Sequence, residues 1–405
     1  MNRSGENNLQ TVPAREIARR IAGLQASMTK KGIDAAIIRQ NADLFYFTGT
    51  VQDSHLIVPS SGTPVLLVKR SLARAQAQSP LRPALPMKTL FELREATFEA
   101  CGGSEPKIIG FELDVLPANA FFVYDEKVFP NQRIVDISRA VRQLRTIKSG
   151  WEIRMLRQAA GISRLVAESV PRLLAAGMTE IELGAELEAV SRKAGNSGMI
   201  RLRGFNMEMV FGHILSGPNA AVPSYTDTPT GGTGISSAFG QGAGNRKIRA
   251  HEIVSVDTMI IRSGYANDQT RNFCIGPPPP KLARAYEFVR SAHARFRDLA
   301  RPGSVTGHLY ETVCKWAEEA GWGTWFMGHS DPKVTFIGHG LGVEVDEFPF
   351  IAENQKLALE QGMVFAFEPK IIIPNEGIAG LENTYLVTSD GIESLNTATE
   401  ELVII

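Results

Sequence analysis

Apolar residues recur at helical and strand spacing through the first third of the chain. Apolar positions three or four residues apart follow Pro13 and predict a helix that ends at Gly32. Short apolar runs bounded by turn residues predict strands over 33–38, 44–47, 56–58, 65–68, 107–112 and 134–137. Further helices are predicted over 70–78 and 117–125. This alternation indicates a mixed α/β sheet domain.

A capping box marks the start of a second domain. Ser149 and Glu152 stand three residues apart at the start of a long amphipathic pattern, and the same pairing recurs over 179–182. Such pairs cap the first turn of a helix, because each residue satisfies a free backbone N–H of the other. We therefore expect a smaller amino-terminal domain over 1–146 and a larger domain over 147–405.

Two predicted hairpins in the larger domain each carry two acidic residues within apolar strands. Asp257 lies in the run VSVDTMIIR, and Asp268 follows eleven residues later on the return strand. Glu368 follows the run GMVFAF, and Glu382 comes fourteen residues later, beyond the turn PNEG. A buried carboxylate without a partner costs several kcal/mol, so each needs a cation, several hydrogen bonds or a shifted pKa.

One histidine completes a candidate metal site. His339 lies between two glycines in IGHGLG, and glycine lets a backbone approach a ligand closely. A lone histidine is more often a hydrogen-bonded core residue than a ligand. Four carboxylates and one imidazole together suit a pair of divalent cations such as Mn, Co, Fe or Zn, because carboxylates can bridge two metals.

The composition excludes several classes of protein. Basic and acidic residues number 43 each and no basic cluster occurs, so we expect no nucleic-acid partner. The three cysteines, Cys101, Cys274 and Cys314, are widely spaced, which suits reduced thiols and excludes a cysteine-rich zinc site. No run of about eighteen apolar residues and no apolar signal segment is present, so we expect no membrane insertion and a cytoplasmic location.

In the order of its motifs, the sequence resembles the pita-bread metallopeptidase family, which includes methionine aminopeptidases, aminopeptidase P, prolidases and creatinase. The motifs are GIDAAII and DLFYFTG in the first third, then KSGWEI, SGPNAAVPS, VDTMIIRSGYANDQTR, GHGLG, GMVFAFEP and GLENT. The resemblance implies an α+β catalytic domain, a curved antiparallel sheet covered by helices, after a smaller α/β creatinase-type domain. It also implies a homodimer.

The resemblance further implies roles for the five candidate ligands. Asp257 would chelate one metal ion, while Asp268 and Glu382 would bridge two ions. His339 and Glu368 would bind the second ion. Glu368 would also handle the proton of a water shared by the two metals.

The auxiliary groups of the proline-peptidase branch are replaced in this chain. Relatives carry histidine at the positions of Ser224 and Asp346, and often at that of Thr335, and they often carry arginine at the position of Gly380. An aspartate donates no proton at neutral pH unless its pKa is raised, so the usual peptidase mechanism does not transfer unchanged. Asp346 is a candidate base or a partner for a cationic substrate group, and it is also explained as a solvated loop residue.

Several other residues are candidates for substrate binding. Ser224 occupies the position of a histidine in relatives, and His213 and His329 are candidates to replace the missing imidazoles. Arg203 is a candidate clamp for a substrate carboxylate. Each of these side chains also has a structural or surface interpretation. The Gly-rich stretch 226–244 is either an exposed insertion or a lid.

Three functions remain open on this basis. The leading one is a dinuclear metal-dependent hydrolase of small amide substrates, most simply an Xaa-Pro dipeptidase or aminopeptidase. The alternative is a family member that acts on a small non-peptide metabolite, as a creatinase-like C–N hydrolase or a lyase with Asp346 as base. The third is a non-catalytic binding module, which has no need of all five ligands.

Overall fold

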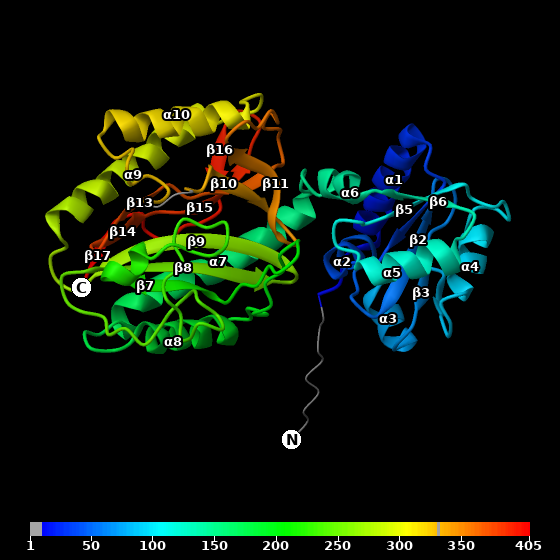
Figure 1. The fold of residues 1–405 in the computed structure, drawn as a ribbon, viewed down its shortest axis with the longest axis horizontal. Coiled ribbons are helices and arrows are strands. Elements are labelled where there is room, and N and C mark those ends of the chain that lie inside the picture. The colour runs from blue at the N-terminus through cyan, green and yellow to red at the C-terminus, as the bar shows by residue number, and fades with distance from the viewer. Residues whose placement is uncertain (1–9, 330–332) are drawn as a thin grey trace, which may run out of the picture. The chain divides into compact units, whose positions relative to one another are not determined.

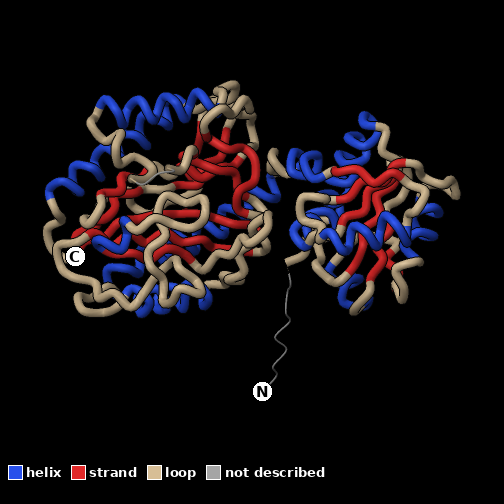
Figure 2. Tube along the Cα trace, in the orientation of Figure 1, coloured by secondary structure: helices blue, strands red, loops and turns tan. Residues whose placement is uncertain are grey.

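The computed structural model describes residues 10–329 and 333–405 and divides the chain into two compact units. One unit ends at Arg145 and the other runs from Thr146 to Ile405. Figures 1 and 2 show that each unit combines helices with a sheet core. The predicted α/β domain followed by an α+β domain is confirmed. Among the described residues, every helix is too short or too polar to span a lipid bilayer.

The first unit is built on one six-stranded mixed sheet of order β4-β3-β2-β1-β5-β6. Its strands are β1 (Ala35–Ile38), β2 (Ser54–Pro59), β3 (Val65–Val68), β4 (Ala84–Pro86), β5 (Ile108–Phe111) and β6 (Arg133–Asp136). Its α-helices are α1 (Ala14–Lys31), α2 (Asn41–Thr48), α3 (Leu72–Gln78), α4 (Glu92–Ala100), α5 (Ala118–Val123) and α6 (Ser138–Leu144). The pairs β1–β2 and β2–β3 are antiparallel, and the other pairs are parallel.

The strand predicted over 44–47 is wrong, because this segment lies in helix α2. The side chain of Gln40 accepts a hydrogen bond from the Asp43 backbone N–H at 2.9 Å, which caps the first turn. Gly49, at φ 79°, closes the last turn in the left-handed conformation. Asp43 also pairs with Arg145 at 2.6 Å in the interior. These caps and this pair outweigh the strand propensity of the aromatic residues.

The second unit packs three sheets between two pairs of helices. Its α-helices are α7 (Gly150–Leu173), α8 (Glu180–Lys193), α9 (Pro280–Leu299) and α10 (Thr306–Glu319). The four-stranded sheet β17-β9-β8-β7 consists of β7 (Gly212–Ser216), β8 (Ile253–Arg262), β9 (Tyr265–Cys274) and β17 (Val403–Ile404). Helices α7 and α8 pack on this sheet, whereas α9 and α10 contact β14 and β11 (Figure 1). Both predicted capping boxes, at Ser149 and at Thr179, are confirmed.

The remaining strands form a five-stranded sheet and a separate pair. The sheet of order β11-β10-β12-β15-β16 consists of β10 (Phe336–Leu341), β11 (Val345–Ala352), β12 (Val364–Phe367), β15 (Asn383–Val387) and β16 (Ile392–Ser394). The pair consists of β13 (Lys370–Ile373) and β14 (Gly377–Gly380). The second predicted hairpin therefore passes from one sheet into another, and Glu368 and Glu382 both lie where the pairing changes.

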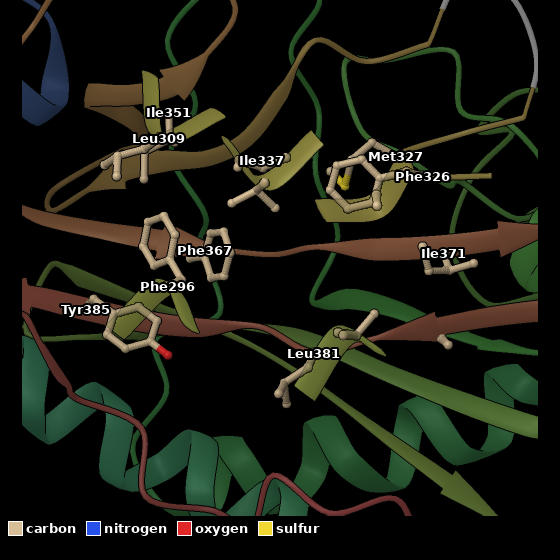
Figure 3. Packing of buried hydrophobic residues seen from close by; sticks show 14 of the residues in the cluster. Phe296, Leu309, Phe326, Met327, Ile337, Ile351, Phe367, Ile371, Leu381 and Tyr385 are labelled. Carbon is tan, nitrogen blue, oxygen red and sulfur yellow. The ribbon is translucent and has the colours of Figure 1, made fainter. Parts of the chain in front are cut away.

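A large apolar cluster holds this crossing in place. Phe367 and Leu381, the residues immediately before Glu368 and Glu382, are both buried in it (Figure 3). The ring of Phe296 from α9 stacks on Phe367 with centroids 3.8 Å apart. Because neighbouring residues of an extended chain point to opposite sides, burial of Phe367 and Leu381 directs the two glutamates away from this core.

Candidate metal centre

The β8–β9 hairpin brings the first two candidate ligands onto neighbouring strands. Asp257 on β8 is opposite Thr270, and Asp268 on β9 is opposite Met259. The two aspartates therefore lie two register positions apart on one sheet. On the other side of β8, His213 on β7 is opposite Asp257. Residues from three consecutive strands thus meet at one place in the sheet.

Strand β10 brings His339 to the same place. It runs between β11 and β12, and its glycines let those neighbours come close. A Cβ at Gly338 would collide with the Ala366 carbonyl oxygen, and a Cβ at Gly340 would collide with the Phe348 backbone. The glycines on both sides of His339 are therefore required by the packing of the sheet.

One cleft collects all five candidate ligands. Its lining includes Asp257, Asp268, His339, Glu368 and Glu382. His213, Asp346 and Lys370 line the same cleft, as do Asp227 and Thr228 from the Gly-rich stretch. The structure thus brings together residues that lie up to 169 positions apart in the sequence.

Three of the ligands form a compact cation-binding group. Asp268, His339 and Glu382 each offer one ligand atom, and these atoms all lie within 4.8 Å of one another. His339 Nε2 lies 3.8 Å from Asp268 Oδ2 and 3.5 Å from Glu368 Oε1. All four side chains are buried. Oxygen and imidazole ligands at such separations suit a divalent ion of the first transition series.

The electrostatics of this group call for a cation. Burial and the charge of neighbouring Asp257 raise the pKa of Asp268 well above its ordinary value. Burial and the charge of Asp268 do the same to the pKa of Glu382. Glu382 Oε2 accepts a hydrogen bond from Thr270, whereas its buried Oε1 has no hydrogen-bond partner among the described residues. A metal ion at Asp268, His339 and Glu382 would satisfy that oxygen and offset the crowded negative charge.

Lys370 is a member of the centre that the sequence analysis missed. It begins β13, two residues after Glu368, and its side chain is 2% exposed. Its Nζ lies 2.7 Å from Glu368 Oε2, 3.0 Å from Asp257 Oδ2 and 3.9 Å from Glu382 Oε2. Burial alone would lower the pKa of this ammonium, but the three carboxylates raise it well above its ordinary value. Lys370 is therefore a buried cation in the acidic cluster.

Gly380 makes the space that Lys370 occupies. The two residues are directly opposite each other on β14 and β13. A Cβ at Gly380 would lie 2.9 Å from Cγ of Lys370. Gly380 therefore leaves room for the Lys370 stem, which extends across it from the opposite strand.

Asp346 lies at the rim of the centre beside His339. Its Oδ1 is 3.5 Å from His339 Nδ1, and its side chain is 39% exposed. The residue has φ 62°, a left-handed conformation that aspartate tolerates better than most residues. Burial opposes protonation of His339, but Asp346 and the nearby acids together raise the pKa of this imidazole. Asp346 therefore acts directly on a candidate metal ligand.

The remaining candidates divide between the cleft and its surroundings. His213 lines the cleft, and burial lowers the pKa of its imidazole, which favours the neutral form. Ser224 and Thr335 lie outside this lining, in a neighbouring hollow, where the Ser224 hydroxyl contacts Thr226 and Gln241. Arg203 also lies outside the lining and pairs with Glu344 at 3.5 Å.

The Gly-rich stretch 226–244 contains no described helix or strand. Hydrogen bonds nevertheless hold it to the rest of the unit at Thr230, at Gly242 and at Gly244. Thr230 Oγ1 donates to the Ala220 carbonyl, and the Gly242 N–H donates to the Gly231 carbonyl, each at 2.6 Å. The Gly244 N–H donates to Glu180. The stretch is therefore neither a loose insertion nor wholly exposed, and Asp227 and Thr228 form part of the cleft wall.

Comparison with known proteins places both units in characterised domain families. Residues 154–389 match the model of metallopeptidase family M24, and residues 20–147 match the creatinase/prolidase N-terminal domain. An Xaa-Pro dipeptidase of Pyrococcus furiosus is 26% identical over 388 residues, which covers 95% of this chain and 99% of the relative. The probable dipeptidase PepE of Mycobacterium tuberculosis is 26% identical over 405 residues, 96% of each chain.

Solved structures show the same architecture. An Xaa-Pro dipeptidase from Bacillus anthracis superposes with a TM-score of 0.82 at 25% identity, covering 96% of this chain and all of that one. The prolidase from Pyrococcus horikoshii gives 0.80 at 24% identity, with 95% of this chain and all of that one covered. At 24% identity, the second comparison supports the fold alone.

Proposed function

The chain belongs to metallopeptidase family M24, and we propose on that basis that it is a metal-dependent hydrolase of small Xaa-Pro peptides. The family model spans more than half of the chain, and the resemblance found in the motifs is confirmed. The Xaa-Pro dipeptidase of Pyrococcus furiosus and the probable dipeptidase of Mycobacterium tuberculosis support a short peptide substrate. The homodimer and the cytoplasmic location stay predictions.

The close grouping of Asp268, His339 and Glu382, together with a buried Glu382 oxygen that has no hydrogen-bond partner among the described residues, carries this proposal. A divalent ion bound there would polarise the scissile carbonyl and lower the pKa of an attacking water. Asp268 lies on β9, His339 on β10, and Glu382 in the buried connection between β14 and β15, so they would hold such an ion rigidly. A non-catalytic binding module has no need of a group of this kind.

Glu368 is the candidate proton acceptor. Its Oε2 is fixed at 2.7 Å from Lys370 Nζ, and its Oε1 faces His339 Nε2 at 3.5 Å. One oxygen is thus anchored while the other faces the metal group, a suitable arrangement for a general base. His213 is the candidate donor to the developing oxyanion, because a neutral imidazole in the cleft can donate a hydrogen bond.

A second candidate function keeps the metal and changes the substrate. Asp346 stands within reach of His339 at the place of a family histidine, and a carboxylate there accepts protons or binds a cation. This observation favours a small cationic or C–H-acidic metabolite, cleaved by C–N hydrolysis or elimination with Asp346 as base.

The test is turnover of Xaa-Pro dipeptides and short Xaa-Pro peptides by metal-free protein supplied with Mn, Co, Fe or Zn. We expect metal-dependent cleavage that Asp268→Asn reduces by at least about 100-fold, since loss of a ligand should exceed the effect of losing its supporting residues. Asp390→Asn, an exposed carboxylate in a turn, is the matched control and should cleave like the wild type.

The outcome separates the two candidate functions. Metal binding without cleavage of any peptide would reject the peptidase and favour the non-peptide reaction. In that case Asp346→Asn should abolish turnover of the metabolite substrate and leave metal binding intact.

A further inference from the structure

We propose that the ammonium of Lys370 takes the place of one of the two metal ions that the ligand pattern predicts, so that the centre binds one divalent ion per chain. The inference rests on the metal dependence of the proposed function and is independent of the peptide specificity. The carboxylate oxygens of the centre are divided between two cation positions.

The first position is filled by the chain itself. Asp257 Oδ2 and Glu368 Oε2 both lie within hydrogen-bond distance of Lys370 Nζ. These are two of the ligands that a two-metal centre needs for its ions. Among the described residues, Asp257 does not join the group whose ligand atoms lie within 4.8 Å of one another.

The second position remains available to a metal ion. Oε2 of Glu382 accepts a hydrogen bond from Thr270, whereas its buried Oε1 has no hydrogen-bond partner among the described residues. Glu368 faces His339 through its other oxygen, Oε1, at 3.5 Å. Glu368 therefore stands between the ammonium on one side and the candidate metal group on the other.

The charge balance favours a single ion. Asp257, Asp268, Glu368 and Glu382 carry four negative charges when ionised. Lys370 and one divalent ion together bring three positive charges, which leaves one negative charge. A second divalent ion would make the net charge of the centre positive. It would also have to bind Asp257 and Glu368, the two carboxylates that already contact the Lys370 ammonium. Repulsion between like charges at a few ångströms is strong in a buried site.

The neighbouring strand is adapted to the lysine. Gly380 has no side chain where a Cβ would meet the Lys370 stem at 2.9 Å, and the aliphatic carbons of the lysine lie over it. The stem therefore has a defined path through the β13–β14 pair, and Lys370 is held in place from the opposite strand. The surrounding strands thus hold the Lys370 ammonium in one position.

The experiment counts ions on the full-length protein. Protein stripped with a chelator is titrated with Mn²⁺ by calorimetry, and bound manganese is measured by mass spectrometry and by electron paramagnetic resonance. We expect one equivalent for the wild type, with the spectrum of an isolated ion. Lys370→Met should bind two, with the spectrum of a coupled pair, because Asp257 and Glu368 lose their cation. Lys281→Met, which removes a half-exposed lysine paired with Glu376, is the matched control and should bind one.

Asp257→Asn provides a second measurement that does not depend on the folding of Lys370→Met. If Asp257 faces the ammonium, this variant still binds one ion, with a dissociation constant changed by less than about tenfold. In a two-metal centre the same change would remove an ion.

Each outcome decides the inference. Two equivalents in the wild type, or one equivalent in folded Lys370→Met, would overturn it. No binding at all would overturn both this inference and the metal dependence of the proposed function. One bound ion without Xaa-Pro cleavage would reject only the peptide specificity.

Discussion

Two buried lysines of the catalytic unit show two different uses of the same side chain. Lys148 is 1% exposed and pairs with Glu347 at 2.8 Å through Oε2. The other oxygen of Glu347 accepts the backbone N–H groups of Val343 and Glu344. Both carboxylate oxygens are thus occupied by groups of the chain itself. Lys370 is equally buried, but it faces three carboxylates.

The difference separates a structural ion pair from a binding site. The carboxylate that faces Lys148 also accepts two backbone N–H groups and so holds the turn at residues 343–344. Around Lys370 the negative charge exceeds the positive, and Glu382 keeps an unsatisfied oxygen. A surplus of buried carboxylate is unfavourable for folding unless a cation arrives, so it marks the place where a ligand with positive charge belongs.

The largest effect is expected from a substitution that breaks the Lys148–Glu347 ion pair. Lys148→Met leaves the Glu347 carboxylate buried without its cation, which should cost about 3–5 kcal/mol of unfolding free energy. Urea denaturation followed by fluorescence measures this loss. Addition of Mn²⁺ should not restore it, because Glu347 does not line the cleft that holds the five candidate ligands. Recovery with Mn²⁺ would show that this pair is also part of the metal centre.

A smaller net effect is expected for Lys370→Met. Without metal, the loss should be about 3 kcal/mol, since one member of a buried ionic cluster is removed. With Mn²⁺ in excess over its dissociation constant, most of this loss should be recovered, because an ion that binds only the folded state stabilises it. Equal melting-temperature shifts with Mn²⁺ in this variant and in Lys148→Met would erase the distinction between the two lysines.

A third buried base sharpens the comparison because it is held neutral. His293 on α9 lies 2.9 Å from the Leu381 carbonyl oxygen and 3.0 Å from the Tyr385 hydroxyl. Burial lowers its pKa from 6.5 to about 3, and nearby Arg271 and Arg297 lower it further, whereas the Leu381 carbonyl and Glu400 have smaller opposing effects. The hydrogen-bond partners of His293 are uncharged, whereas those of the two lysines are carboxylates.

Near pH 6 the smallest of the three effects is expected, and it concerns the pH dependence of stability. The unfolded chain takes up a proton at His293 near pH 6.5, whereas the folded chain does so near pH 3. Stability should be fully present above pH 6.5 and should fall by up to about 1.4 kcal/mol per pH unit between these values. His293→Gln should lower the proton uptake on unfolding at pH 5 by about one. An unchanged pH slope in this variant would show that His293 is protonated in the fold.

Local signals predicted most helices and strands. The capping boxes at Ser149 and Thr179 and the β8–β9 hairpin were readable because neighbouring residues decide them. The segment 44–47 was not, since its helix depends on the Gln40 cap, Gly49 and the distant Arg145. Sequence position also gives no sign that the second hairpin changes sheets at Glu368 and Glu382.

The sequence predicted which acids and which histidine meet in the centre, but it did not predict the other side chains around them. All five candidate ligands meet in one cleft, because acids and a histidine in apolar strands stand out in a sequence. Lys370 was missed, although a lysine that opens the apolar run KIII of a buried strand was a usable signal. Ser224 and Arg203 lie outside the lining of this cleft, and their roles in substrate binding stay predictions.

The lysine in the acidic cluster has a consequence for how the protein depends on its surroundings. An ammonium on the chain cannot be chelated, diluted away or exchanged for a different element. The cell would then supply one transition-metal ion per polypeptide, and only one position could take up the wrong metal. Activation by added metal would follow a simple hyperbola, without the sigmoidal onset of an enzyme that must collect two ions before it can work.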